Sequence, residues 1–163
     1  MSDSSYLIRE IRPEDNPKIE AIIKAIFPEF GLPLTGTAYE DEEIKKMYES
    51  YSNKNEVYLV LEENGEVVGG AGIKPLKDVD ASICELQKMY FTPASRGKGL
   101  GKQMFLACLD WAKSNGYQRC YLESASQLKT AVRMYESYGF DYLDGPLGNT
   151  GHFSCGIWMI KTL

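Results

Sequence analysis

The stretch that decides the fold is ELQKMYFTPASRGKGLGKQMF, residues 85–105. It starts inside an apolar run, residues 83–91, whose composition predicts a β-strand. Past Pro93 comes a basic, glycine-rich turn, RGKGLGK, at residues 96–102, and apolar residues then recur at helical spacing over residues 99–115. Strand, turn and helix in this order predict an anion cradle, because backbone N–H groups and the positive end of the helix dipole point at one anion.

Length and composition predict an ordinary globular protein. The chain has 163 residues, 44% of them apolar and 25% charged, which suits a single domain over residues 1–163 with a structured core over about 6–163. A net charge of −5 argues against nucleic acid as a partner. The basic residues of the glycine-rich turn are a local exception that calls for an anionic ligand.

The sequence also bears on location and metal content. No apolar run approaches the roughly 20 residues of a membrane span, and the N-terminus does not have the pattern of a secretory signal, so a cytoplasmic protein without membrane contact is expected. Four widely spaced cysteines favour buried free thiols in a reducing compartment over disulfides. His152 is the only histidine, and no ligand cluster surrounds it in the sequence, so we expect no metal.

The remaining elements follow from periodicity and turn residues. Strands are expected at residues 6–11, 57–62, 66–73, 83–91, 120–122, 140–143 and 153–161, and helices from about residue 16 to 27 and at 39–51, 99–115 and 128–138. Asn64-Gly65 predicts a tight hairpin between two strands. The expected fold is therefore α/β (α+β), a mixed sheet of about six to seven strands flanked by about four helices.

Two other phosphate-binding motifs do not fit the glycine-rich turn. A Walker loop requires Ser or Thr after its lysine, whereas Lys102 is followed by Gln103. A Rossmann fingerprint requires the spacing G-x-G-x-x-G, which the glycines at 97, 99 and 101 lack. A plain surface turn with solvated basic residues remains the structural alternative.

Two motifs carry a resemblance to a known family. Arg96-x-x-Gly99-x-Gly101, after a strand and opening a helix, resembles the acetyl-CoA pyrophosphate motif R/Q-x-x-G-x-G/A of the GNAT N-acetyltransferase superfamily. The segment AVRMYESYGF, residues 131–140, is similar to the A-x-x-L-Y-x-x-x-G-F pattern of that superfamily's next helix. The order of elements matches over nearly the whole chain. One departure is Leu128, where many members have an asparagine that contacts the cofactor.

The resemblance implies the GNAT acyl-CoA N-acyltransferase fold, acetyl-CoA as acyl donor and an amine acceptor, either a small molecule or a peptide. Dimers are frequent in the family, and the sequence leaves the oligomeric state open. In this family the pantetheine arm lies like an extra strand between two splayed parallel strands. The cofactor-binding residues implied in this way are Met89, Tyr90, Phe91, Arg96, Gly97, Lys98, Gly99, Leu100, Gly101 and Lys102.

Glu85 is the candidate general base. It lies in an apolar strand, where burial would raise its pKa toward neutrality, and members of the superfamily that use a glutamate base often have it at this place. Side chains alternate along a strand, so Glu85, Gln87 and Met89 are expected on one face. Glu85 would act directly or through a bound water. The alternative is a solvated strand residue or one paired with Lys88.

Tyr135 is the candidate general acid, because it matches the tyrosine of the family's helix motif, which usually lies near the sulfur of CoA. The alternative is an aromatic side chain in the core. His152, in a polar glycine-rich loop at 148–153, is a candidate acceptor-site residue or alternative base. A hydrogen-bonded structural role for this histidine is the alternative.

The expected function is transfer of an acetyl group from acetyl-CoA to a primary amine, by direct attack in a ternary complex. Two alternatives stay open. One is a catalytically inactive GNAT-like domain that binds CoA or a partner, and the other is a transferase that uses another acyl-CoA. The sequence does not identify the amine.

Overall fold

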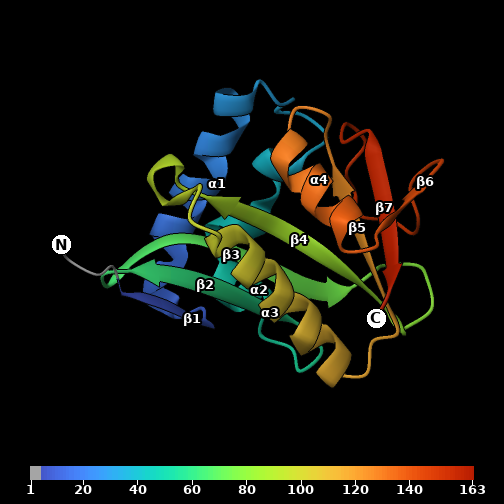
Figure 1. Ribbon diagram of the computed structural model, residues 1–163, viewed down its shortest axis with the longest axis horizontal. Helices are drawn as coiled ribbons and strands as arrows, with labels where there is room; N and C mark the ends of the chain where they lie inside the picture. Colours follow the sequence, from blue (N-terminus) through green and yellow to red (C-terminus); the bar gives the residue numbers. More distant parts are fainter. Residues whose placement is uncertain (1–4) are drawn as a thin grey trace.

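Seven strands form one sheet in the computed structural model, which describes residues 5–163 (Figure 1). The strands are β1 Tyr6–Glu10, β2 Val57–Glu63, β3 Glu66–Pro75, β4 Ile83–Phe91, β5 Arg119–Ser124, β6 Asp141–Leu143 and β7 Ile157–Thr162. The helices are α1 Asn16–Phe30, α2 Met47–Ser50, α3 Leu100–Ser114 and α4 Lys129–Ser137. This confirms the expected mixed α/β architecture.

The sheet has the order β1-β2-β3-β4-β5-β7-β6. β4 and β5 pair in parallel, joined by α3, and the other neighbours pair antiparallel. The predicted hairpin is confirmed between β2 and β3, where Asn64 and Gly65 both have left-handed φ values of 53° and 85°.

The helices cover both faces of the sheet (Figure 1). α1 and α2 pack on one face, and the isoleucines of α1 form the centre of that core cluster. α3 and α4 pack on the other face, where Met104, Phe105 and Tyr135 contribute to a second cluster. Within the part of the chain that the structure describes, no helix combines the length and apolarity needed to cross a bilayer.

The connection between α1 and β2 differs from the expectation. α1 does not stop near Phe27 but continues through Pro28, because a proline near the C-terminus of a helix removes only one hydrogen bond, and Gly31 ends it with φ 63°. The helix expected at 39–51 is replaced by two 3-10 turns, Ala38–Glu40 and Glu42–Lys45, and the four-residue α2. Its acidic side chains bind partners on other segments, as the site below shows.

The last strand also begins later than predicted. Residues 153–156 form a loop, because the N–H groups of Phe153 and Ser154 donate to the carbonyl of Gly36 at 2.9 and 3.1 Å. The C-terminal loop is thereby attached to the α1–α2 segment before β7 starts at Ile157.

A bulge interrupts β4 at Lys88, which has a left-handed φ of 51°. The register passes from Gly72–Gln87 to Gly70–Tyr90, and the Tyr58 hydroxyl donates to the Lys88 carbonyl at 2.9 Å. Glycine is required on the partner strand, because a Cβ at Gly70 would lie 2.5 Å from the Tyr58 ring. The bulge makes the expected alternation wrong beyond Gln87: Met89 packs with the core cluster of α3, on the face opposite Glu85.

β4 and β5 separate along their length. Their parallel pairing covers only Ile83–Arg119, Cys84–Cys120 and Glu85–Tyr121, although β4 runs on to Phe91 and β5 to Ser124. The two strands are adjacent near the C-terminus of the chain and diverge toward α1 and α4 (Figure 1). The backbone edges of both strands beyond this point do not pair with each other, so an extended ligand can lie between them.

Candidate active site

Glu85 stands where the pairing of β4 and β5 ends, with only 5% of the residue exposed. Burial raises the pKa of its carboxyl to about 7, and the hydrogen bond from Gln87 opposes that rise. Near neutral pH the carboxyl can therefore both accept and release a proton, which a general base requires.

A chain of hydrogen bonds orients the Glu85 carboxylate. The Tyr51 hydroxyl donates to Gln87 Oε1 at 2.7 Å, and Gln87 Nε2 donates to Glu85 Oε1 at 2.5 Å. Gly72 on β3 leaves room for the Tyr51 ring, because a Cβ at residue 72 would lie 2.7 Å from that ring. The alternative pairing of Glu85 with Lys88 is not found, because Lys88 binds other carboxylates.

Two adjoining cavities open beside Glu85, on the face of the sheet covered by α1. The first has about 580 Å³ of empty space, part of it open to solvent, and the second about 740 Å³. The residues that line both are Glu85, Gln87, Lys88 and His152. The walls come from the α1–α2 segment, the end of β3, β4, the end of β5 with the residues after it, and the loop before β7, so five separate parts of the chain build the site.

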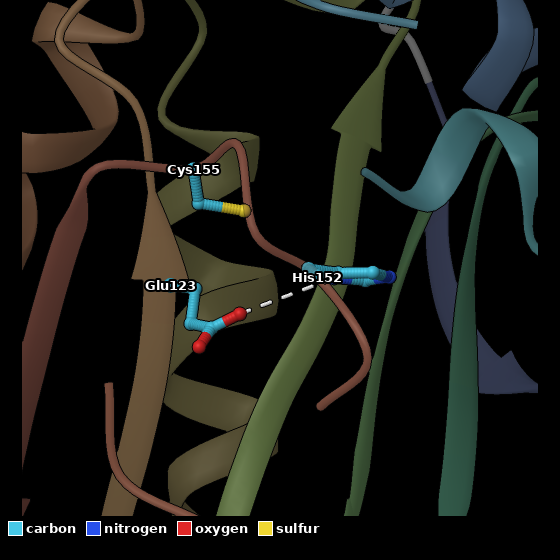
Figure 2. A group of neighbouring side chains, drawn as sticks. All are labelled: Glu123, His152 and Cys155. Atoms are coloured by element: carbon cyan, nitrogen blue, oxygen red, sulfur yellow. Dashed lines mark ion pairs between the residues drawn. The ribbon is translucent and has the colours of Figure 1, made fainter. Parts of the chain in front are cut away.

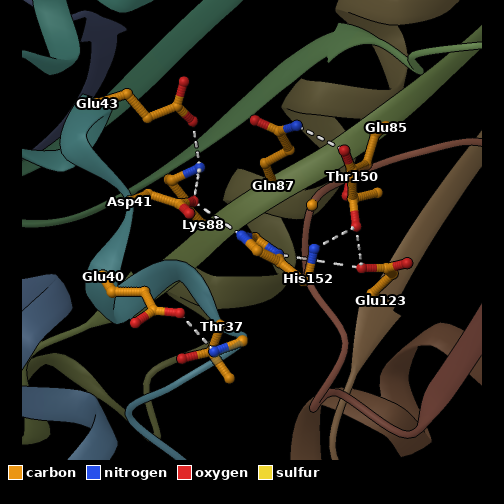
Figure 3. Close-up of polar contacts among 12 residues, drawn as sticks. Thr37, Glu40, Asp41, Glu43, Glu85, Gln87, Lys88, Glu123, Thr150 and His152 are labelled. Atoms are coloured by element: carbon orange, nitrogen blue, oxygen red, sulfur yellow. Dashed lines mark hydrogen bonds and ion pairs between the residues drawn. The ribbon is translucent and has the colours of Figure 1, made fainter.

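A buried charge network closes the second cavity (Figure 3). Lys88 Nζ, whose side chain is 3% exposed, pairs with Glu43 and, at 3.4 Å, with Asp41. Burial disfavours ionisation of both acids, yet the contacts with His152 and Lys88 hold the pKa of Asp41 below its usual value, and Lys88 does the same for the pKa of Glu43. These acids are therefore structural counter-ions as well as cavity walls.

His152 bridges this network to β5. Its Nε2 lies 2.8 Å from Asp41 Oδ2, and its Nδ1 lies 4.0 Å from Glu123 Oε1. Burial lowers the pKa of His152, but the hydrogen bonds with Asp41 and Cys155 and the charge of Asp41 together outweigh burial, and the pKa rises to about 10. Such an imidazole is protonated near neutral pH, so it suits a structural cation better than the alternative base considered from the sequence.

The expectation that no ligand cluster surrounds His152 is wrong. Glu123 lies far from it in sequence and Cys155 follows it by three residues in the same loop, and one ligand atom of each of the three residues lies within 4.8 Å of the others. Cys155 is also the half-buried one among four free thiols, while Cys84, Cys108 and Cys120 are buried in the core as predicted.

Tyr135 stands apart from Glu85. It lies on the buried side of α4, its ring 5.6 Å from that of Phe105 and 6.0 Å from that of Phe140, and it is not among the residues that line the two cavities. Burial raises the pKa of its phenol, which keeps the hydroxyl protonated. The structure thus brings Glu85 and His152 together but places Tyr135 in the packing between α3 and α4.

The glycine-rich turn has the geometry of an anion cradle. Gly97 and Gly99 have left-handed φ values of 78° and 77°, and no atom lies within 4 Å of the position of a Cβ at either residue. Gly99 precedes α3 without a side-chain cap, so the first N–H groups of the helix, from Leu100 and Gly101, are free to bind a ligand. This open, uncapped helix start fits the diphosphate of a CoA thioester.

Acidic side chains neutralise two of the cradle cations. Arg96 forms a two-pronged ion pair with Glu29 at the end of α1 and donates to the Phe91 carbonyl at 2.7 Å. Lys98 pairs with Glu63 at 2.8 Å, and Lys102 lies over the Tyr138 ring at 5.8 Å. An incoming phosphate would compete with Glu29 and Glu63 for these cations.

Sequence reasoning found part of the site. Gln87 was expected on the face of Glu85 and Thr150 lies in the loop at 148–153 considered for the acceptor, and both line a cavity with Glu85. Lys88 and Glu123 also line a cavity, but no local motif marks them as cavity residues. One signal was available for Glu123, which is a second acidic residue in an apolar strand, as Glu85 is. The bulge at Lys88 had no such signal, because glycines on a different strand create the room for it.

Comparison with known proteins identifies the family to which the sequence is similar. Residues 19–140 match the Acetyltransferase (GNAT) family. The chain is 42% identical over 164 residues to a protein of Escherichia coli strain K12 named "Uncharacterized N-acetyltransferase YjgM", an alignment covering 100% of this chain and 98% of the relative.

Solved structures share the fold. An acetyltransferase of the GNAT family from Staphylococcus aureus Mu50 superimposes with a TM-score of 0.83, covering 97% of this chain and 99% of its own at 17% identity. The yncA protein of Salmonella typhimurium, solved with its cofactor acetyl-CoA, superimposes with a TM-score of 0.77 at 22% identity, covering 97% of this chain and 94% of its own.

Proposed function

The chain belongs to the GNAT acetyltransferase family, and from that premise we propose that it moves an acetyl group from acetyl-CoA to a primary amine by direct attack in a ternary complex. N-acetyltransferase activity is the shared activity of its relatives. The observation that carries the finer proposal is the end of β4–β5 pairing at Glu85, because a carboxyl with a pKa of about 7 then stands at the vertex of the gap.

Two regions of the chain support binding of the diphosphate and the pantetheine arm of an acyl-CoA. The uncapped start of α3 and the open glycines at 97 and 99 would hold the diphosphate. The β4 edge at Met89–Phe91, unpaired with β5, would bind the pantetheine arm through backbone groups. The thioester supplies an activated acetyl group, and all that follows is done by side chains and backbone of this protein.

Glu85 would take the proton from the amine, directly or through a water, as the nitrogen attacks the thioester carbon. A backbone N–H group of the β4 bulge would stabilise the negative charge that develops on the thioester oxygen, since the bulge frees Lys88 and Met89 from pairing with β3. Tyr135, kept protonated by burial, would give a proton to the departing thiolate.

The amine would enter through the cavities lined by Glu85, Lys88 and His152. This side of the sheet is opposite to α3, so donor and acceptor would approach the vertex from different directions. The arrangement supports direct transfer, because both substrates can be present together. Free thiols buried in the core are consistent with a cytoplasmic, reducing location, which we propose as well.

The test is release of free CoA in the presence of acetyl-CoA and a panel of primary amines: amino acids, polyamines, aminoglycosides, and peptides with a free N-terminus or a lysine. We expect amine-dependent release, with initial-rate lines that intersect when both substrates are varied. Parallel lines would contradict a ternary complex. CoA binding without turnover of any amine, and no effect of Tyr135→Phe, would favour the inactive binding domain.

The acyl group is tested separately. Mass spectrometry of the thioester that co-purifies, together with kcat/KM for acetyl-CoA and succinyl-CoA, distinguishes the two donors. We expect acetyl-CoA to have the higher kcat/KM, and a preference for succinyl-CoA would refute the acetyl assignment.

A further inference from the structure

Three side chains with different ligand atoms converge on one point beside the acceptor cavity (Figure 2). Glu123 comes from the end of β5, and His152 and Cys155 come from the loop before β7. Figure 2 shows the thiol and the carboxylate directed into the space beside the imidazole. An oxygen, a nitrogen and a sulfur ligand are thus assembled in the wall of the first cavity, where the catalytic proposal gives none of the three a chemical step.

The spacing of the ligand atoms is close to that of a tetrahedral metal site. The three atoms lie within 4.8 Å of one another, and Nδ1 and Oε1 are 4.0 Å apart. Ligands at zinc bond lengths are about 3.5 Å apart in a tetrahedron. Small side-chain rotations of Glu123 and Cys155 would therefore close the site.

A second layer of contacts orients two of the ligands. Asp41 Oδ2 binds His152 Nε2 at 2.8 Å, which leaves Nδ1 directed toward Glu123. Thr150 donates to Glu123 Oε1 and Tyr121 to Glu123 Oε2, both at 2.7 Å. A carboxylate on the far nitrogen of a histidine and hydroxyls on a ligating carboxylate are the usual supports of metal ligands in proteins.

Once His152 has lost its Nδ1 proton, the charge around the cluster also suits a cation. The Glu123 side chain is 3% exposed, so its carboxylate has little water to solvate it. The nearby cation Lys88 is paired with Asp41 and Glu43 and directs its ammonium group to them.

We propose that Glu123, His152 and Cys155 bind a divalent transition-metal ion of the zinc class, with a fourth coordination position open to the cavity that Glu85 also lines. The mixture of thiolate, imidazole and carboxylate selects zinc over magnesium or calcium, which prefer oxygen ligands. Because His152 is protonated near neutral pH in the metal-free protein, binding displaces its Nδ1 proton as well as the Cys155 thiol proton, and both go to solvent. A bound ion would occupy the path of the amine, so zinc would inhibit acetyl transfer; only this consequence rests on the proposed function.

Binding is tested on the metal-free, full-length protein without a histidine tag, since the chain has a single histidine. Zn²⁺ is titrated by calorimetry and Co²⁺ by absorption spectroscopy. We expect one site and a thiolate-to-cobalt charge-transfer band that disappears in Cys155→Ser. His152→Ala and Glu123→Gln should each weaken zinc binding by about 100-fold or more. Asp41→Asn changes a residue that supports a ligand, so its loss should be smaller, about 10- to 100-fold.

The matched control is Glu66→Gln, an exposed carboxylate on the β2–β3 hairpin, which should bind zinc like the wild type. Circular dichroism checks that each variant is folded. Equal zinc affinity in the wild type and the three ligand variants, or equal affinity for Mg²⁺ and Zn²⁺, would overturn the proposal.

Inhibition is measured separately as zinc-dependent loss of amine-dependent CoA release, reversed by a chelator. We expect zinc to inhibit the wild type. For Cys155→Ser, with each rate taken relative to the same protein without metal, the zinc concentration that halves the rate should be at least about 10-fold higher. Absence of turnover with every amine would refute the proposed function and leave the calorimetric result standing. Turnover by a protein that does not bind zinc would refute the metal site alone.

Discussion

The proposed phosphate cradle and the proposed acceptor side of the site are built in opposite ways. The cradle is one continuous segment, residues 96–102, whose cations lie near the surface and pair with single acids. The proposed acceptor side brings together five separate segments around a lysine whose side chain is 3% exposed and a glutamate that is 5% exposed. A local backbone motif can bind a common ligand such as a diphosphate, whereas discrimination among amines requires side chains from distant parts of the chain.

The largest expected effect is a loss of kcat/KM when Glu85, the proposed general base, is replaced. Glu85→Gln keeps the shape of the side chain but cannot accept a proton, so kcat/KM should fall about 10²- to 10⁴-fold. Because burial raises the pKa of Glu85 to about 7, the wild type should gain activity as pH rises through 7, and the variant should lose this inflection. Initial rates across pH, with Glu66→Gln as control, measure it. An inflection that persists in Glu85→Gln would assign the base to another group.

The next prediction compares a buried and a surface lysine. Lys88→Met removes the cation between Asp41 and Glu43, leaving two largely buried acids with fewer partners, and should lower the free energy of unfolding by about 3 kcal/mol. Lys98→Met breaks the pair with Glu63, but this lysine side chain is exposed, so the loss should be clearly smaller than that in Lys88→Met. Denaturant unfolding of both variants measures the difference. Equal losses would show that the acceptor network is no more stabilising than a surface pair.

The two ends of α3 provide a matched pair of glycine variants. Gly99 and Gly116 have φ values of 77° and 89°, and neither would have an atom within 4 Å of an added Cβ. Valine at either position adds backbone strain of about 1–3 kcal/mol. If the strain at residue 99 is relieved by distorting the cradle, CoA affinity should fall about 10- to 100-fold in Gly99→Val alone. Calorimetry with CoA measures it, and an equal loss in Gly116→Val would contradict the cradle assignment.

The same contrast explains what the sequence could predict. The hairpin at Asn64-Gly65 and the core face of α3 were predictable, because turn residues and helical periodicity act over a few neighbouring positions. The helix expected at 39–51 was wrong because Asp41 and Glu43 bind Lys88 and His152, contacts that depend on the assembled fold. Met89 was assigned to the wrong face because the bulge at Lys88 depends on glycines of β3. Glu123 joins His152 and Cys155 only once β5 and the last loop have met.

The smallest effect tests whether the cradle is restrained by its own acids. In the free protein Glu29 occupies the guanidinium of Arg96 with two contacts, where a phosphate would bind. The hydrogen bond from Arg96 lowers the pKa of Glu29, so this competing carboxylate is ionised at neutral pH. Glu29→Gln removes the competitor. Because a partly exposed pair contributes about 0.2–1 kcal/mol, CoA should bind up to about 5-fold more tightly.

Calorimetry with CoA at low and high salt measures this change, which should shrink as salt screens the pair. Glu20→Gln is the control. Glu20 lies on the same helix as Glu29, but it pairs with Lys24 of that helix and not with a residue of the cradle. Weaker CoA binding in Glu29→Gln would mean that Glu29 holds Arg96 in its binding position instead of competing for it. The geometry of the cradle would then depend on α1, which is distant in sequence. Both sides of the site would need contacts between distant segments, and they would differ only in how deeply their charged side chains are buried.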